Sequence, residues 1–214
     1  MELRGLLSMD TSGLAQLTQH YKSRDDGFRI LINRFNCKVG VELGVRFGYF
    51  SSFLLNETGL QVLHGIDIDK NSNISSVEAT FGPRYKFILS DGIKAAEQFA
   101  DDSLDFIYHD SCHKENYVYD ELNAWWPKAK SGAIIAGDDY MQFYVGDEGH
   151  FGVIQAVDRF TKEKNIGFSI IGTNATNPNE LTQYGINMGN ELTKKLNGHH
   201  NTFTQVPNWY LIKP

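Results

Sequence analysis

The stretch DFIYHDSCHKENYVYDELNAWWPKAKSGAIIAGDDY, residues 105–140, decides the fold. Two short apolar runs, 104–108 and 133–136, have the length and composition of buried strands. Between them, residues 115–126 are long enough for a helix and carry their large apolar side chains on one side. A strand, a helix and a second strand in this order predict a parallel βαβ crossover.

Each of these apolar runs ends on acid. Asp110 follows the first run, and Asp138 and Asp139 follow the second. In an open parallel sheet the ligand crevice lies beyond the carboxyl ends of the strands, so the three aspartates should converge there. Carboxylate oxygens are the ligands that Mg²⁺ prefers, and we therefore expect a Mg²⁺-type cation. The alternative is structural, because Asp138 and Asp139 could be a helix N-cap and its solvated neighbour.

The rest of the chain alternates strands with helices. We expect strands at 38–43, 62–66, 85–89, 104–109, 133–137, 168–171 and 209–212, and helices at 26–35, 49–56, 74–81, 93–99, 115–126 and 151–164. This alternation predicts a doubly wound α/β fold with a seven-stranded sheet. We expect a single domain over residues 1–214, with an amino-terminal helical segment at 1–37. Residues 172–207, rich in Asn, Thr and Gly, are predicted to be an irregular excursion before the last strand.

The composition is that of an ordinary soluble enzyme. The 214 residues are 41% hydrophobic, which is enough to bury a full core. A net charge of -6 without a Lys/Arg cluster argues against nucleic acid as the main partner. No run approaches the ~18 apolar residues that cross a bilayer, and the amino terminus lacks the regions of a signal peptide. We expect a cytoplasmic protein with no membrane partner and with Cys37 and Cys112 as reduced thiols; homo-oligomerisation stays open.

The first crossover carries a second signature, a glycine-containing turn after a strand. Residues 41–48 read VELGVRFG, which places Glu42 at the end of the strand. Gly44 and Gly48 follow at the turn, where backbone must approach a ligand closely. Asp67 ends the next strand, nineteen residues after Gly48, where an acid can accept hydrogen bonds from ribose hydroxyls.

The third strand also ends on acid, at Asp91 and Gly92, where a carboxylate or a backbone amide could meet an adenine amino group. The three strand ends together predict a cofactor that contains a nucleoside. A dinucleotide turn would read G-x-G-x-x-G, but Arg46 stands where the middle glycine would be, and Glu42 would repel a pyrophosphate. Glu42 suits a cation instead, such as the α-amino group and sulfonium of S-adenosylmethionine.

At these residues the chain resembles the class I S-adenosylmethionine-dependent methyltransferases, and among them the metal-dependent small-molecule O-methyltransferases of the macrocin, novobiocin and catechol types. The shared pattern is E-x-G-x-x-x-G, then D-G-x-H-like and D-D-Y-like segments, over residues 39–140. Arg46 and Ser111 depart from it, since small residues are more usual there. The resemblance implies a mostly parallel Rossmann-like methyltransferase sheet with helices on both faces.

The resemblance also implies roles for single residues. The implied cofactor-binding residues are Glu42, Gly44, Gly48, Asp67, Asp91 and Gly92; the metal ligands are Asp110, Asp138 and Asp139; and the catalytic residues are His113 and Asp110. The implied reaction is direct methyl transfer to a hydroxyl of a small acceptor, such as a sugar or a phenol. A divalent cation, expected to be Mg²⁺, would lower the pKa of that hydroxyl, and His113 would remove its proton.

Other interpretations stay open. His113 could simply be a polar residue that opens the helix, and His109 is predicted to be a strand residue rather than a ligand. An NAD-dependent oxidoreductase would share the fold, but it needs the glycine pattern that Glu42 and Arg46 disrupt. A non-catalytic cofactor-binding subunit of the same fold would usually have lost either the cofactor acids or the metal acids, and both sets are present.

Overall fold

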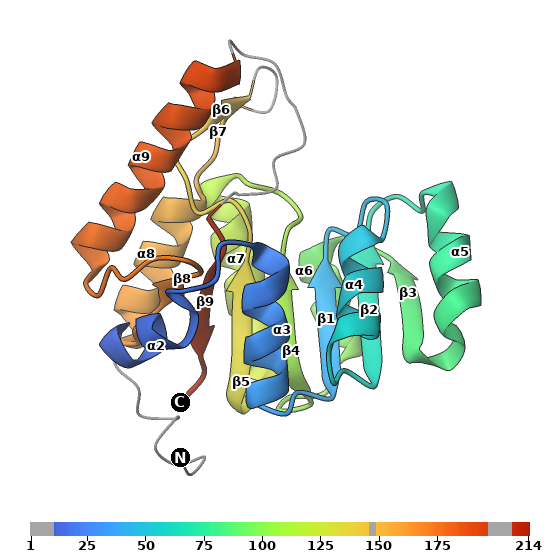
Figure 1. Cartoon of the computed structure of the whole chain (residues 1–214). Helices are drawn as coiled ribbons and strands as arrows, with labels where there is room; N and C mark the ends of the chain where they lie inside the picture. Colours follow the sequence, from blue (N-terminus) through green and yellow to red (C-terminus); the bar gives the residue numbers. More distant parts are fainter. Residues whose placement is uncertain (1–10, 146–148, 197–206) are drawn as a thin grey trace.

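The computed structural model describes residues 11–145, 149–196 and 207–214, and its centre is a seven-stranded sheet (Figure 1). In spatial order the strands are β3 (Tyr85–Leu89), β2 (Val62–Asp67), β1 (Val39–Leu43), β4 (Leu104–His109), β5 (Ala129–Gly137), β9 (Trp209–Ile212) and β8 (Ser169–Ile170). The first five pair in parallel, and β9 runs antiparallel to both of its neighbours. The predicted doubly wound, mostly parallel sheet is confirmed.

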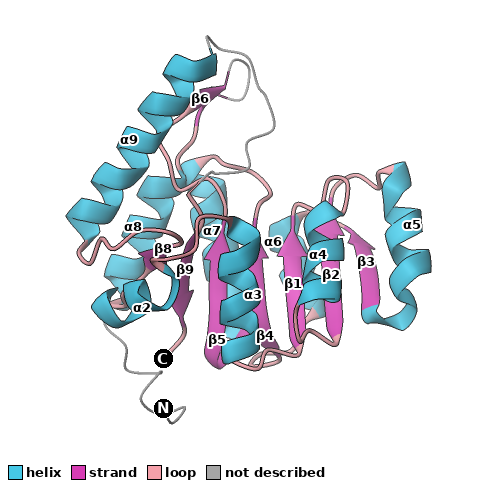
Figure 2. Ribbon diagram, in the orientation of Figure 1, coloured by secondary structure: helices cyan, strands magenta, loops and turns pink. Residues whose placement is uncertain are grey.

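Helices cover both faces of the sheet (Figure 2). One face carries α2 (Thr11–Thr18), α3 (Arg24–Arg34), α4 (Tyr49–Glu57) and α5 (Ser72–Phe81). The other carries α6 (Gly92–Ala95), α7 (Glu115–Trp125) and α8 (Val153–Lys164). Short 3₁₀ turns occupy Gly82–Arg84, Ala96–Gln98 and Trp126–Lys128. The helical segment predicted at 1–37 contains α2 and α3, and its residues 1–10 lie outside the described part of the chain.

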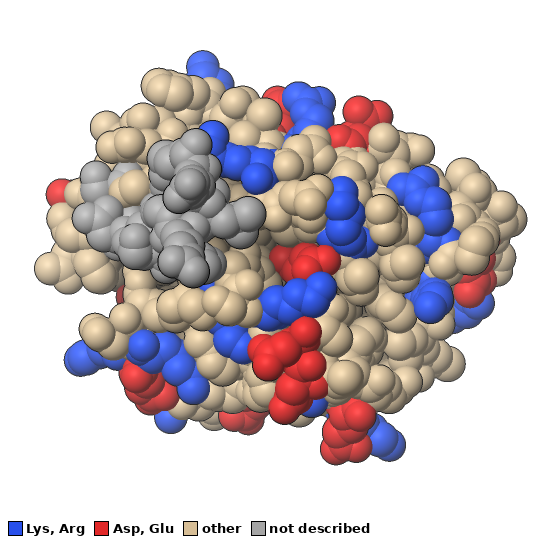
Figure 3. Space-filling view, turned by 90° about the horizontal axis from the view of Figure 1, so that it is seen from below, with Lys and Arg blue, Asp and Glu red and all other residues tan. Residues whose placement is uncertain are grey.

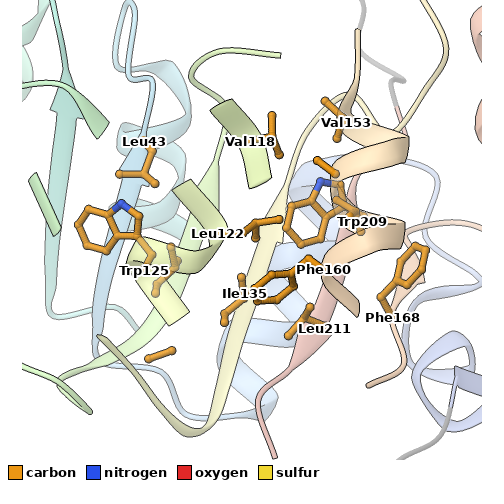
Figure 4. Close-up of a cluster of buried hydrophobic side chains, with 14 of the residues drawn as sticks. Leu43, Val118, Leu122, Trp125, Ile135, Val153, Phe160, Phe168, Trp209 and Leu211 are labelled. Carbon is orange, nitrogen blue, oxygen red and sulfur yellow. The ribbon is translucent and has the colours of Figure 1, made fainter. Parts of the chain in front are cut away.

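The packing of α7 shows why the predicted crossover forms. Val118, Leu122 and Trp125 lie on one side of this helix and are buried against the sheet (Figure 4). In the same apolar layer, Phe160 of α8 and Trp209 of β9 are at most 1% exposed. Burial of each such side chain contributes about 1.5–3 kcal/mol to folding. These contacts fix α7 over the strands whose ends carry the acids.

The register of β1, β4 and β5 aligns their carboxyl ends. Leu43 lies opposite His109, and His109 lies opposite Gly137. The residues that follow these three positions therefore leave the sheet side by side. The strand order also reverses between β1 and β4, which is where open α/β sheets bind their ligands.

The region predicted to be an irregular excursion, residues 172–207, differs from that expectation. Most of its described part is one long helix, α9 (Pro178–Leu196), which stands beside α8 (Figure 1). Its buried positions repeat every four residues, at Leu181, Gly185 and Gly189. Two of the three are glycines. Leu181, Tyr184 and Met188 do have helical spacing in the sequence, but the Asn, Thr and Gly content of the region favoured a loop, and the helix was therefore not predicted. A short hairpin, β6 (Tyr144–Val145) and β7 (Gly149–His150), was also not predicted.

The underside of the molecule, where the parallel strands begin, carries interspersed charges of both signs (Figure 3). Several are paired at this end of the sheet: Lys128 lies 2.6 Å from Asp101, and Lys130 lies 2.7 Å from Asp105. One partner in each pair, Lys128 and Asp105, is only partly exposed. No helix within the described residues is long and apolar enough to span a membrane.

Candidate functional site

The glycine turn after β1 lies directly against the loop after β4. Gly44 has a φ of +85°, and a Cβ added there would lie 2.0 Å from the carbonyl oxygen of Asp110. Gly48 has a φ of +73° and begins α4, and a Cβ there would meet Val77. Both predicted glycines thus stand where side chains do not fit. Arg46, at the position expected to be small, adopts a φ of +52° and is exposed.

Asp67, at the end of β2, holds the backbone of this turn. Its Oδ2 accepts hydrogen bonds from the amides of Val45 (2.9 Å) and Arg46 (2.8 Å). Its Oδ1 accepts from the amide of Asp69 at 3.1 Å. Each carboxylate oxygen can accept more than one hydrogen bond, so Asp67 can also receive ribose hydroxyls. The structure therefore gives this residue a turn-fixing contact that the sequence did not reveal.

Asp91 caps α6. Its Oδ1 accepts from the amides of Ile93 (3.0 Å) and Lys94 (3.1 Å), and its Oδ2 accepts from the hydroxyl of Tyr117 at 2.7 Å. Burial alone would raise the pKa of Asp91, but these hydrogen bonds outweigh it and lower the pKa. The carboxylate is already well occupied, so a contact to adenine through this group stays a prediction. Gly92 is buried, and a Cβ there would collide with Glu121.

Glu42 is deeply buried at the end of β1. It is 2% exposed, and its Oε2 accepts a hydrogen bond from the hydroxyl of Ser51 on α4. Burial raises the pKa of Glu42 to about 8; the Ser51 hydrogen bond opposes this, and the negative charge of Asp110 adds to it. A cation beside this group would favour its ionised form. A buried acid of this kind suits a positively charged ligand and disfavours a pyrophosphate.

The three acids after β4 and β5 converge, as the strand register requires. Nε2 of His113 lies 3.1 Å from Oδ2 of Asp139 and 3.6 Å from Oδ1 of Asp110. Asp138 is 8% exposed and accepts a hydrogen bond from the amide of Asp139, which has a φ of +53°. Phe151 stacks on the ring of His113, with the ring centroids 4.4 Å apart. The imidazole is thus held between two carboxylates and an aromatic face.

The aspartates of this cluster repel one another. Burial and the neighbouring acids raise the pKa of Asp138 well above its usual range, and burial raises the pKa of Asp110. Burial lowers the pKa of His113, but the neighbouring carboxylates of Asp110 and Asp139 outweigh it and raise the pKa to about 11. This arrangement therefore favours the protonated ring. A role as a base would require those carboxylates to interact with another group.

Asp110, Asp138 and Asp139 place three carboxylates close together, and their negative charges raise the pKa of Asp138. Carboxylate oxygens are the ligands that a hard divalent cation prefers, so the residue types fit such an ion. The side chains are not yet arranged as a ligand set. Within the described ranges, no group of three or more His, Cys, Asp or Glu side chains is placed to hold a metal ion. Binding would need the carboxylates of Asp110 and Asp139 to turn away from His113.

One feature beside the site was missed from the sequence. Glu121 of α7 is 1% exposed; its Oε1 accepts from the hydroxyl of Ser111 and its Oε2 lies against Nδ1 of His109, both at 2.8 Å. A signal was present, because Glu121 falls on the apolar side of the predicted helix, beside Val118 and Leu122. A charged residue on a buried stripe indicates a paired group.

Residues 41–140 match the family model of a methyltransferase domain. No curated protein matches the sequence. The matched segment begins in β1 and ends just after the paired acids Asp138 and Asp139. The matched segment therefore contains every site residue predicted from the sequence, whereas α8, α9 and β9 lie beyond it.

Solved structures share this fold. An O-methyltransferase of tomaymycin synthesis from Streptomyces achromogenes, in complex with SAM, is 13% identical with a TM-score of 0.57, covering 89% of this chain and 80% of its own. A 1,6-didemethyltoxoflavin-N1-methyltransferase from Burkholderia thailandensis, with S-adenosylhomocysteine bound, is 10% identical with a TM-score of 0.54, covering 86% and 75%. A Clostridium thermocellum protein described as an rRNA-methylase is 15% identical with a TM-score of 0.57, covering 89% and 93%. At these identities the likeness establishes the fold.

Proposed function

We propose that this protein is an S-adenosylmethionine-dependent methyltransferase that methylates a hydroxyl of a small molecule with the help of a divalent cation. The observation that carries the proposal is the contact between two loops. The turn at Gly44, which would hold the cofactor, touches the loop at Asp110, which would hold the acceptor. A methyl donor and a methyl acceptor bound to these loops would be neighbours, as direct transfer requires.

The chain's own residues account for cofactor binding in this proposal. The buried Glu42 lies where a cationic group of the methionine part would bind, and Asp67 orders the turn and faces the ribose. Gly44 and Gly48 allow the turn to pack directly against Asp110 and Val77, because a Cβ at either glycine would collide there. The NAD alternative is disfavoured because Arg46 replaces a glycine and because Glu42 would face a pyrophosphate.

Asp110, Asp138 and Asp139 would hold the divalent cation. When bound, such a cation lowers the pKa of a coordinated hydroxyl and fixes its position. His113, released from Asp110 and Asp139, would accept the proton. Phe151 and Phe143 pack edge to face beside His113, with ring centroids 5.7 Å apart, and form an apolar wall that limits water near the reacting groups.

The packing of α9 beside the site favours a small methyl acceptor. The backbone of α9 packs against the loop that follows the paired acids, with Gly185 against the carbonyl of Tyr140 and Gly189 against Gln142. This close approach leaves little room there for a macromolecule.

Calorimetry tests the cofactor assignment. We expect S-adenosylhomocysteine to bind and NAD to give no heat; the reverse result would overturn the proposal. The same protein is then assayed with labelled S-adenosylmethionine and a panel of phenols and sugars, with Mg²⁺ or with EDTA. Transfer that is equal under both conditions would remove the cation from the proposal and leave the methyltransferase assignment in place.

A further inference from the structure

A small cavity lies between the ends of β4 and β5 and the helices α7 and α8. Its lining includes Asp110, Asp138, Val118, Val153, His109 and Trp209. It has room for about one water molecule. The cavity therefore lies between the acid cluster and the side of the sheet that carries α7.

Three buried ring nitrogens in this lining lack a hydrogen-bond partner among the described residues. One of them, Nε2 of His113, forms an ion pair with Asp139 at 3.1 Å; the other two belong to His109 and Trp209. Nε2 of His109 and Nε1 of Trp209 have none within the described part of the chain, although the two residues are 5% and 1% exposed. In Figure 4 the indole nitrogen of Trp209 points toward Val118 and Val153, which line the same cavity. An unmet buried polar group costs about 1–3 kcal/mol, so each nitrogen indicates a missing partner.

The two nitrogens have complementary hydrogen-bonding roles. Glu121 accepts from Ser111 at one oxygen and lies 2.8 Å from Nδ1 of His109 at the other, so it acts as an acceptor toward both. Nδ1 then carries the ring proton, and Nε2 presents a lone pair. The indole N–H of Trp209 can only donate. A partner that satisfies both nitrogens must accept one hydrogen bond and donate another.

The placement of the pair is fixed by packing. The rings of His109 and Trp209 lie nearly parallel, 26° apart, with centroids at 6.1 Å. Trp209 lies over Gly137, where a Cβ would approach the indole to 2.7 Å. Glu121 in turn holds His109 from α7. Neither ring can readily turn away to find another partner.

We propose that His109 and Trp209 form a subsite for a single hydroxyl-type oxygen, which donates to Nε2 of His109 and accepts from Nε1 of Trp209. The oxygen belongs either to a water or to an alcohol group, and both have the required chemistry. The proposal rests on and deepens the proposed function. An alcohol in this subsite would anchor the acceptor beside Asp110 and Asp138.

Indole resonances in a ¹H–¹⁵N NMR spectrum test the subsite. The chain has three tryptophans, so Trp209→Phe assigns the relevant signal. In the free protein, and again after S-adenosylhomocysteine is added, we expect the Trp209 indole proton to show a nuclear Overhauser effect to a long-lived water. Added methanol should replace it with an effect from the methyl group if alcohols enter. Acetonitrile accepts a hydrogen bond but cannot donate one, so it should neither displace the water nor give an effect from its own methyl group. Trp125, whose Nε1 donates to the carbonyl of Gly92 at 2.9 Å, is the internal control and should not respond.

If the Trp209 indole proton shows a nuclear Overhauser effect only to water, the oxygen in the subsite belongs to water. An effect from the methyl group of methanol shows that an alcohol can supply it. Either result supports the subsite. The absence of both effects, or equal shifts with methanol and acetonitrile, overturns it. A long-range ¹⁵N spectrum of His109 gives an independent check that needs no variant. A proton on Nε2 in place of Nδ1 would make both nitrogens donors and also overturn the proposal. The NMR readout needs no methyl acceptor, so failure of the transfer assay or of the cofactor titration remains distinguishable.

Discussion

Gly44 and Asp110 are so close that a Cβ at residue 44 would lie 2.0 Å from the carbonyl oxygen of Asp110. The contact joins the end of β1 to the end of β4, where the winding of the sheet reverses. In the proposed function it also joins the methyl donor to the methyl acceptor. A change at this one glycine should therefore disturb both halves of the site.

Gly44→Ala tests this coupling. Any side chain at Gly44 suffers the strain of a positive φ, about 1–2 kcal/mol, and also collides with the Asp110 loop. We expect weaker binding of S-adenosylhomocysteine and a loss of methyl transfer, measured by calorimetry and by the transfer assay. Gly82→Ala is the matched control, because Gly82 also has a positive φ but has nothing within 4 Å of the added Cβ. Equal binding by both variants would mean that the contact has no role in the site.

Asp67→Ala should weaken binding of S-adenosylhomocysteine by about 1.5–3 kcal/mol, the range for hydrogen bonds to a charged group. The variant loses the acceptor of the Val45 and Arg46 amides as well as the expected ribose contact. Asp69→Ala serves as the control, since Asp69 is exposed and only its backbone amide bonds to Asp67. If only Asp69→Ala weakened binding, the ribose role would pass to that residue.

Glu42→Gln should separate stability from cofactor affinity. The pKa of Glu42 is raised by burial to about 8, so the folded protein holds a proton that the unfolded chain loses above its usual value of 4.5. Stability should therefore fall as the pH rises from about 4.5 to 8, by at most about 1.4 kcal/mol per pH unit for one proton. Glu42→Gln should lose this part of the pH dependence and unfold at higher denaturant concentration than the wild type at pH 8.5.

The same variant should bind S-adenosylmethionine more weakly, because it cannot ionise beside the cationic ligand. Denaturation at pH 6 and pH 8.5, with and without the ligand, measures both effects. Unchanged affinity for S-adenosylmethionine would place its cationic groups elsewhere in the crevice.

Asp158→Ala tests the attachment of α9. Oδ1 of Asp158 on α8 accepts from the hydroxyl of Tyr140 at 2.5 Å, and Oδ2 accepts from Thr182 of α9 at 2.9 Å. Loss of both should destabilise the docked helix by about 1–3 kcal/mol. Hydrogen exchange across α9 should accelerate, whereas exchange in β1 should not change. Glu163→Gln, on the exposed side of α8, is the control, and similar exchange in the two variants would contradict the tether.

The sequence predicted the features that depend on local pattern. Apolar runs ending in acid, together with the rule that ligands bind at the carboxyl ends of parallel strands, were enough to bring Asp110 and Asp138 together. The helix α9 was missed because its apolar residues, such as Leu181 and Tyr184, are interspersed with Gly185, Gly189 and several Asn and Thr residues, a composition typical of loops. It is stabilised by close backbone approach, a property of the tertiary structure.

The pairing of His109 with Trp209 could not be predicted either. The two residues are one hundred positions apart, and the antiparallel pairing of β9 with β5 puts Trp209 opposite Gly137, next to His109. A short apolar run near the end of a chain does not reveal which strand it joins. The buried position of Glu42 is a similar case, because the direction of its side chain depends on Ser51 in a separate helix.

Variants of the acid cluster distinguish cation-dependent methyl transfer from transfer that depends only on holding the donor and the acceptor close together. The carboxylates of Asp110, Asp138 and Asp139 repel one another unless a cation or a proton lies among them. Asp138→Ala should therefore behave as the wild type does in EDTA, with S-adenosylhomocysteine binding retained and methyl transfer lost even in excess Mg²⁺. His113→Ala should keep its response to Mg²⁺ and lose rate by ~10²–10⁴-fold, as expected for a general base. Asp120→Ala, which removes an exposed acid of α7, is the control for net charge and should leave both properties unchanged. If Asp138→Ala retained full, Mg²⁺-independent transfer, the three acids would be helix caps and hydrogen-bond acceptors, and His113 would remain as the main catalytic candidate.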